Sequence, residues 1–250
     1  MLYNIYFSPT GGVKKVAGCL CGAMAPVHSD FDLIRTPTAL PAFTVEDVCV
    51  ISVPAYGGRV PEICAQRIAE TNGNGAKAVL VAVFGNRAID DTLIELYDIV
   101  KARGFSVVAA VEAVAEHSLV RVYGSGRPDG DDRRELESFA GIIAEKIRAA
   151  DLSEPDIPGA RPYRDYTPSP MSLVLDLTCT GCKKCALECP AGAIPLTDVS
   201  RFDKEKCICC LRCVAVCPVK ARHNSPEAEK SLEERLRERC AGRKENRLYI

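Results

Sequence analysis

The sequence predicts an α/β domain with a parallel sheet, followed by a small cysteine-rich domain. Two observations support this prediction. Over residues 1–150, apolar stretches of strand length alternate with stretches of helical periodicity, which is the pattern of strand–helix–strand units. Beyond residue 171, eight of the 14 cysteines fall into two runs of equal spacing. A chain of 250 residues has room for one larger domain and one smaller domain.

The elements of the first domain can be placed in order along the chain. Strands are expected at Leu2–Phe7, Asp30–Ile34, Asp47–Val53, Ala78–Phe84 and Ser106–Val114. Helical patterns lie between and after them, at Val13–Met24, Pro61–Thr71, Ala88–Arg103 and Asp131–Ala150. Five strands joined by helical crossovers predict a doubly wound, five-stranded parallel sheet of the flavodoxin-like type.

The rest of the chain divides into three segments. Residues 151–171 contain five prolines, and this density favours an extended linker. Residues 172–224 hold the cysteine runs, which repeat at a fixed offset of 28 residues from Cys179 to Cys207 onwards and so indicate an internal duplication. Residues 225–250 are expected to form a charged C-terminal helix and tail, in which the charged helical pattern of Glu227–Arg239 favours a solvated terminal helix.

Composition narrows the classes of function. The formal net charge is −1, without the basic stripe of a nucleic-acid-binding protein. No apolar run reaches the length of a membrane span, and Met1 leads directly into a strand, so neither a membrane anchor nor a signal peptide is expected. Many cysteines in such a chain favour metal ligation over disulfides, and we expect a cytoplasmic protein.

Each cysteine run has the spacing Cys-x-x-Cys-x-x-Cys-x-x-x-Cys-Pro. The first comprises Cys179, Cys182, Cys185 and Cys189, and the second comprises Cys207, Cys210, Cys213 and Cys217. Thiolates are soft ligands that suit iron–sulfur clusters, and closely spaced cysteines can supply three corners of a cubane from one turn. Zinc is the alternative, although zinc sites typically pair two Cys-x-x-Cys knuckles. Cys209 is an alternative ligand to Cys210, but only Cys210 keeps the repeat offset.

The two runs resemble those of the bacterial two-cluster ferredoxin family. The resemblance implies two [4Fe-4S] clusters in which the fourth cysteine of each run ligates the other cluster. One ligand set is then Cys179, Cys182, Cys185 and Cys217, and the other is Cys207, Cys210, Cys213 and Cys189. All-thiolate ligation predicts low-potential, oxygen-sensitive clusters and an anaerobic or microaerobic cell. Five further cysteines share no spacing and are expected to be inert core residues: Cys19, Cys21, Cys49, Cys64 and Cys240.

A loop of small and hydroxylated residues follows the first strand and opens a helix. Its backbone N–H groups and the helix N-terminus favour a phosphate, and it lacks both the Walker A and the dinucleotide fingerprints. It looks like the loop of flavodoxins that binds the phosphate of FMN. The residues that carry this resemblance are Ser8, Thr10, Gly11, Gly12, Val13 and Lys14.

Two further loops follow the third and fourth strands, at the carboxyl ends where open α/β sheets bind ligands. They correspond to the flavodoxin loops that hold the isoalloxazine ring of FMN, and Tyr56 offers an aromatic face for stacking. The residues concerned are Pro54, Ala55, Tyr56, Gly57 and Gly58 in one loop and Phe84, Gly85, Asn86, Arg87 and Asp90 in the other. Because Val13 and Ile89 depart from the flavodoxin pattern, a flavodoxin-like fold that binds no flavin is the alternative.

Taken in order, these motifs resemble the EFR1 family of ferredoxins, in which a flavodoxin domain is fused to a two-cluster ferredoxin domain. The resemblance implies an electron-transfer protein that passes electrons between the two clusters and FMN, with a redox protein or a small-molecule electron acceptor as partner. The alternative is an FMN-dependent reductase of a small molecule, fed by its own ferredoxin domain, with Arg59, Arg87 or His117 lining its pocket. No catalytic residue is predicted, because the sequence has no Ser-His-Asp, paired-acid or NAD motif.

Overall fold

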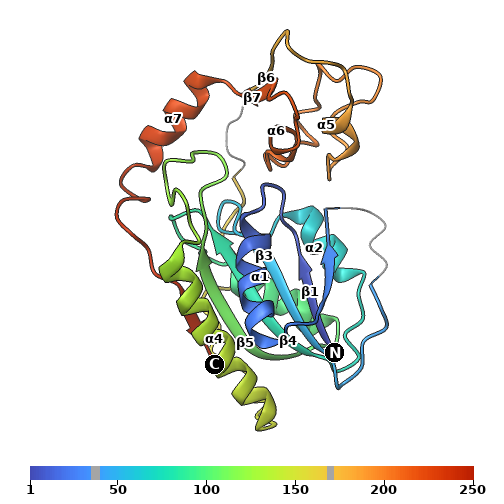
Figure 1. Ribbon diagram of the computed structural model, residues 1–250, viewed down its shortest axis with the longest axis vertical. Coiled ribbons are helices and arrows are strands. Elements are labelled where there is room, and N and C mark those ends of the chain that lie inside the picture. Colours follow the sequence, from blue (N-terminus) through green and yellow to red (C-terminus); the bar gives the residue numbers. More distant parts are fainter. Residues whose placement is uncertain (35–39, 168–171) are drawn as a thin grey trace.

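The computed structural model describes residues 1–34, 40–167 and 172–250 (Figure 1). The larger part of the molecule is a sheet with helices on both faces, and the smaller part holds the two cysteine runs. The smaller part stands over the carboxyl ends of the parallel strands, where Ile208 and Cys209 line a cavity together with the strand-end loops. The two parts are joined by the linker and, a second time, by the C-terminal segment (Figure 1).

The sheet confirms the predicted flavodoxin-like topology. Its parallel strands are β1 (Leu2–Tyr6), β2 (Ser29–Asp32), β3 (Val48–Pro54), β4 (Lys77–Phe84) and β5 (Ser106–Val114). They lie in the order β2-β1-β3-β4-β5, which is the flavodoxin order. A sixth strand that the sequence analysis missed, β8 (Arg247–Tyr249), pairs antiparallel with β5 through Val111 and Leu248. Three residues are too few for a period-2 pattern to stand out.

Helices cover both faces because the central strands are apolar on both. In β3, Val50 packs in the cluster under α1 (Gly12–Met24) and α4 (Gly130–Arg148). The next residue, Ile51, packs in the cluster under α2 (Glu62–Ala69) and α3 (Thr92–Ala102).

The helix that was predicted to begin at Ala88 is α3, and it begins four residues later, at Thr92. Residues 85–91 form a loop in which Asp90 adopts a positive φ of 44°, which an α-helix does not allow.

The linker is extended, as its prolines predict, but it is docked against the larger part. Between residues 151 and 167 it forms no helix or strand. The backbone N–H groups of Ala160 and Arg164 donate to the Asp91 carboxylate at 2.9 and 2.8 Å. Arg161 also forms an ion pair with Asp98 on α3 at 2.5 Å. The last residues of the predicted linker, 168–171, lie outside the described ranges.

The cysteine-rich part shows the duplication in its backbone. Helices α5 (Lys184–Leu187) and α6 (Arg212–Ala215) begin 28 residues apart, and the residue before each has a left-handed φ, 60° at Lys183 and 56° at Leu211. Strands β6 (Leu173–Leu175) and β7 (Arg222–Asn224) pair antiparallel and close this small unit.

The C-terminal segment returns to the larger part. Ser225 caps α7 (Pro226–Leu236) by accepting from the N–H of Ala228, and the charged side chains of the helix are mostly exposed, as expected of a solvated helix. Leu232 anchors the helix itself, and the tail beyond it returns to the larger part, where Cys240 is buried and β8 joins the sheet. The charge pattern hides these few apolar anchors.

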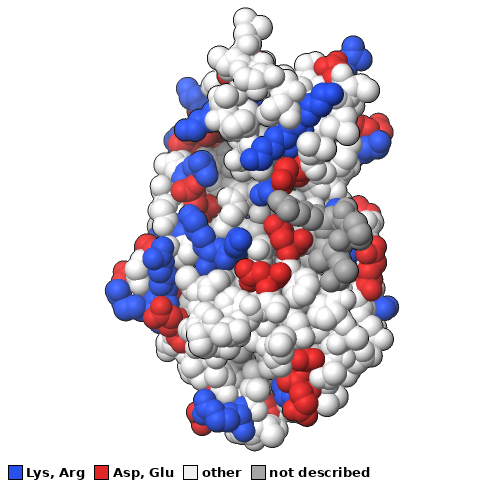
Figure 2. Space-filling view, turned by 45° about the vertical axis from the view of Figure 1, so that its right-hand side comes forward, with Lys and Arg blue, Asp and Glu red and all other residues white. Residues whose placement is uncertain are grey.

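The charged residues on the face drawn in Figure 2 are of both signs and intermixed, without a stripe of one sign. No helix in the described ranges is both long enough and apolar enough to span a bilayer.

Candidate functional site

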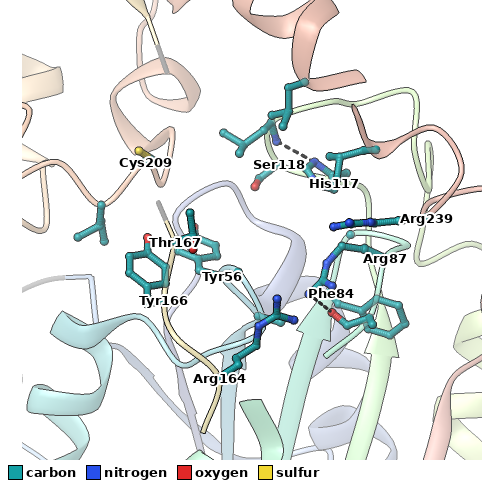
Figure 3. A pocket seen from close by; sticks show the side chains of 18 of the residues that line it. Tyr56, Phe84, Arg87, His117, Ser118, Arg164, Tyr166, Thr167, Cys209 and Arg239 are labelled. Carbon is teal, nitrogen blue, oxygen red and sulfur yellow. Dashed lines mark hydrogen bonds between the residues drawn. The ribbon is translucent and has the colours of Figure 1, made fainter. Parts of the chain in front are cut away.

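Two adjoining cavities lie at the carboxyl ends of the strands. The smaller one, which we call the loop cavity, has a volume of about 60 Å³ and lies beside the loop after β1. The larger one, the interface cavity, has a volume of about 230 Å³ and reaches from the strand-end loops to the cysteine-rich part and α7 (Figure 3). Both are lined by Ala55, Tyr56, Phe84, Gly85, His117 and Ser118. The three loops predicted to hold FMN therefore meet at one place.

The loop after β1 is built as a helix N-terminus that opens into the loop cavity. Gly11 has a φ of 96°, a conformation that favours glycine, and α1 begins at the next residue. The buried Ser8 hydroxyl accepts from the N–H of Lys14 at 2.9 Å, so this donor is already used. Of the predicted residues, Ser8, Thr10, Gly12 and Val13 line the cavity.

Lys14 was predicted to lie at the phosphate site, but it lines neither cavity. Its ammonium lies over the Tyr6 ring, 5.6 Å from the ring centroid. A side chain two residues into a helix points along the helix surface, which the sequence pattern alone does not reveal.

The loops after β3 and β4, which were predicted to hold the isoalloxazine ring, pack so closely that they require glycine at two positions. A Cβ at Gly85 would lie 2.6 Å from Cα of His117, and one at Gly58 would lie 2.1 Å from Oδ2 of Asp90. Gly58 also has a φ of 85°. Gly85 thus lets the loop after β4 approach His117 at the mouth of the interface cavity.

Three of the predicted ring-loop residues line neither cavity: Gly58, Asn86 and Asp90. The Asn86 amide donates to the carbonyls of Cys240 and Gly242 at 2.7 and 2.8 Å, so it holds the C-terminal segment. Asp90 accepts from Arg87 and Arg164 and acts as their counterion.

His117 is a neutral hydrogen-bonding group at the cavity wall. Burial, with a smaller contribution from the positive charge of Arg87, lowers the pKa of His117 to about 4. Its Nδ1 accepts from the N–H groups of Leu119 and Val120 at 3.2 and 3.0 Å, which places the proton on Nε2. The imidazole can therefore donate one hydrogen bond without carrying charge.

Arginines from three separate segments line the interface cavity. Arg87 follows β4, Arg164 belongs to the linker, and Arg239 follows α7 (Figure 3). Only Arg87 was predicted; no local signal marks the other two, because the tertiary fold brings them there. Arg59 lines a different cavity of about 640 Å³, on the other side of Tyr166 and Cys209.

One predicted cluster ligand set meets at a cavity inside the cysteine-rich part. Cys207, Cys210 and Cys213 of the second run line it together with Cys189 of the first. Cys210 and Cys213 are 7% and 8% exposed, and burial, together with the neighbouring thiols, raises the pKa of each to about 12. Cys209 does not line this cavity; it lines the interface cavity instead.

The other predicted ligand set is more exposed to solvent. Cys182 is exposed, and Cys179, Cys185 and Cys217 are half-buried. The N–H of Asp176 donates to the carbonyl of Ala221 at 2.8 Å and so holds the segment before Cys179 beside the segment after Cys217. Burial opposes ionisation of Cys217, but backbone N–H groups of residues 219–222 outweigh it and lower the pKa of this thiol. Among the described residues, no three His, Cys, Asp or Glu side chains converge as the ligands of a single metal ion.

Residues 178–221 match the family model described as a 4Fe-4S dicluster domain. This segment is a two-cluster iron–sulfur domain. Its match decides between the zinc and iron–sulfur alternatives and supports a role in electron transfer. A 49-residue segment is 55% identical to one component of the ion-translocating oxidoreductase complex of Methanosarcina acetivorans, and it covers 19% of this chain and 19% of that protein.

Solved structures similar to this chain include two flavodoxins. The flavodoxin of Streptococcus pneumonia TIGR4 is 20% identical over 58% of this chain and 99% of its own, with a TM-score of 0.40. Flavodoxin 1 of Bacillus cereus is 16% identical over 58% of this chain and 97% of its own, with a TM-score of 0.40. Rubredoxin oxygen:oxidoreductase of Desulfovibrio gigas is 15% identical over 59% of this chain and 36% of its own, with a TM-score of 0.43.

Proposed function

We propose that this protein passes electrons between two [4Fe-4S] clusters in its cysteine-rich part and an FMN at the strand ends of its larger part. The interface cavity is the observation that carries the proposal. One wall consists of the loops after β3 and β4, and the opposite wall includes Ile208 and Cys209, which lie between the cluster ligands Cys207 and Cys210. FMN exchanges one or two electrons and a cluster exchanges one, so their proximity would couple the two kinds of transfer.

The residues present fit an FMN. The loop cavity, at the N-terminus of α1, offers a small polar space for the phosphate, which backbone N–H groups and the helix dipole favour. The interface cavity offers the aromatic walls of Tyr56 and Phe84 to a ring, and His117 offers an uncharged donor through Nε2. Val13 lines the loop cavity without blocking it.

The residues also fit two clusters with crossed ligands. Cys189 lies with Cys207, Cys210 and Cys213 at one cavity, which supports exchange of the fourth ligand between the runs. The N–H of Ala193 lies 3.3 Å from Sγ of Cys189, and the N–H of Gly181 lies 3.4 Å from Sγ of Cys179. Hydrogen bonds to the ligating sulfurs are one of the features that set the potential of an iron–sulfur cluster.

We further propose a redox protein as the external partner, in a reducing cytoplasm. The sequence similarity to a component of an oxidoreductase complex supports a protein partner. The exposed position of Cys182 supports electron exchange at the first cysteine run. The order of the two domains supports the resemblance to the EFR1 family.

The test is FMN titration of the anaerobically reconstituted, cluster-loaded protein. We expect one FMN per chain and no FAD in the extracted flavin. Gly85→Ala should weaken FMN binding by about tenfold or more, because the new Cβ pushes His117 into the cavity, while iron content stays unchanged. Gly141→Ala is the matched control, since nothing lies within 4 Å of its added Cβ. No FMN binding at micromolar concentration, or FAD as the bound flavin, contradicts the proposal.

The arginines of the interface cavity favour a second candidate function, an FMN-dependent reductase of a small molecule. A carrier needs no substrate pocket, whereas a reductase needs polar groups beside the ring. Arg87, Arg164 and Arg239 are such groups, although Arg59, which was also predicted for this role, lines another cavity. Turnover of an added small molecule by reduced protein, measured against protein without FMN, separates the reductase from the carrier.

A further inference from the structure

We propose that the interface cavity binds a small planar carboxylate, held by Arg239 together with Arg87 and Arg164. This inference rests on the proposed function, because it concerns the cavity assigned to the flavin ring and names the class of small molecule that binds there beside it. The three arginines come from separate segments and surround one space (Figure 3).

The charges around the cavity leave one positive charge without compensation. Arg87 and Arg164 both contact the single carboxylate of Asp90, which cannot neutralise two guanidinium groups. Asp165 is the one acidic residue on the wall. Arg239 forms no hydrogen bond or ion pair with any residue in the described ranges. Three cations against two carboxylates favour a monoanion.

Near neutral pH, His117 does not alter this balance, because burial keeps its imidazole uncharged. Its Nε2 adds a hydrogen-bond donor beside the arginines. Arg164 and Arg239 are exposed, whereas the Arg87 side chain is 21% exposed, so a charge-assisted hydrogen bond at Arg87 is stronger than one in water.

The shape and walls of the cavity favour a flat carboxylic acid. A guanidinium group presents paired N–H donors that match the two oxygens of a carboxylate. The wall also includes apolar and aromatic side chains, among them Phe84, Tyr166, Leu232 and Leu236, beside the polar Ser118 and Thr167. A volume of about 230 Å³ is below the range of roughly 300–1,000 Å³ that is typical of drug-sized ligands, and the flavin ring would occupy part of it, so the carboxylate is small.

The test compares 4-fluorobenzoate with its neutral analogue 4-fluorobenzamide by ¹⁹F NMR, on cluster-loaded protein with FMN bound. We expect the carboxylate to bind at least about tenfold more tightly than the amide. Arg239→Gln should abolish that preference without changing binding of the amide. Arg237→Gln is the matched control, since it removes a charge two residues away that does not line the cavity.

Equal binding of both probes, or an unchanged preference in Arg239→Gln, overturns the inference, as does an equal loss in Arg237→Gln. The inference is also overturned if FMN and 4-fluorobenzoate displace each other, so that no complex holds both. FMN titration of the same samples separates the two proposals. Protein that binds FMN but not 4-fluorobenzoate disproves only the carboxylate site, whereas protein that binds no FMN disproves the proposed function.

Discussion

The two cysteine runs are nearly identical as ligand motifs, yet the fold gives them different surroundings. In the first run Cys182 is exposed, and Leu187 beside it is 70% exposed. In the second run the equivalent cysteine, Cys210, is 7% exposed, and the residue before it lines the interface cavity. Cys182 therefore faces solvent and Cys209 faces the larger part, although the Pro190 carbonyl at the end of the first run also accepts from Arg67 of α2 at 3.0 Å. The role of each run is set by its neighbours.

Single equivalent positions show how this difference arises. Arg212 in the second run corresponds to Lys184 in the first. Arg212 contacts Glu188 of the first run at 2.5 Å and donates to the carbonyl of Pro9, in the loop after β1, at 3.2 Å. Lys184 is exposed and forms no side-chain hydrogen bond or ion pair with the described residues. One side chain thus ties the second run to the first run and to the larger part.

The largest expected effect concerns the exchange of the fourth ligand. Cys189→Ala combined with Cys210→Ala should damage one cluster and leave about half of the iron, because both residues belong to the set that meets at one cavity. Cys189→Ala combined with Cys182→Ala should damage both clusters. Iron analysis and electron paramagnetic resonance of the reduced protein measure this, and the reverse pattern would show that each run closes its own cluster.

The second prediction contrasts two histidines, one at the interface cavity and one in the cysteine-rich part. His117, at the interface cavity, has a pKa of about 4 when folded and about 6.5 when unfolded. The unfolded chain therefore binds the proton first as pH falls, and stability is lost between about pH 6.5 and pH 4, by at most about 3 kcal/mol. In urea titrations at a series of pH values, His117→Gln should reduce this loss of stability on acidification.

His223, on β7 of the cysteine-rich part, should change stability with pH in the opposite direction. The Asn224 carbonyl, and then Asp176, raise the pKa of His223, so its contribution is present below about pH 6.5 and is lost as pH rises through the folded pKa. His223→Gln should leave the loss of stability on acidification unchanged and flatten the pH dependence just above pH 6.5. Identical pH profiles for the two variants would show that the surroundings of these histidines do not differ as described.

A third, smaller effect is expected at Arg212. Arg212→Leu removes the ion pair with the half-buried Glu188 and the bond to the Pro9 carbonyl, and the free energy of unfolding should fall by about 1–3 kcal/mol. Lys184→Leu is the matched control at the equivalent position and should change stability by no more than about 0.5 kcal/mol. Equal losses in anaerobic urea denaturation would contradict the tethering role of Arg212.

The smallest effect should occur at Cys209, which corresponds to Gly181. Both residues have a positive φ, 55° and 68°, and only glycine adopts this conformation without cost. Cys209→Gly should therefore stabilise the protein by up to about 1 kcal/mol and keep the iron content, because Cys210 lines the cluster cavity in its place. Loss of a cluster in this variant would identify Cys209 as a ligand.

Much of the fold could be predicted because its signals are local. The five parallel strands, their order and the cysteine part follow from apolar stretches and fixed spacing. The errors lie where local patterns are weak or overridden. The predicted start of α3 failed at the positive φ of Asp90, and β8 is only three residues long. The side chains of Lys14 and Asn86, both predicted as flavin contacts, line neither of the two cavities; they contact Tyr6 and the C-terminal segment.

The sequence by itself determined the α/β class, the two ligand runs and the strand-end loops, because each depends on residues that are close neighbours in the chain. Only the tertiary structure decided which run is buried and which residues complete the interface cavity. Arg164 and Arg239 reach that cavity from the linker and the C-terminal segment. Their positions depend on distant contacts, such as the bond from Arg164 N–H to Asp91 and the bonds from Asn86 to Cys240 and Gly242. Contacts between residues far apart in the chain leave no periodic trace in the sequence.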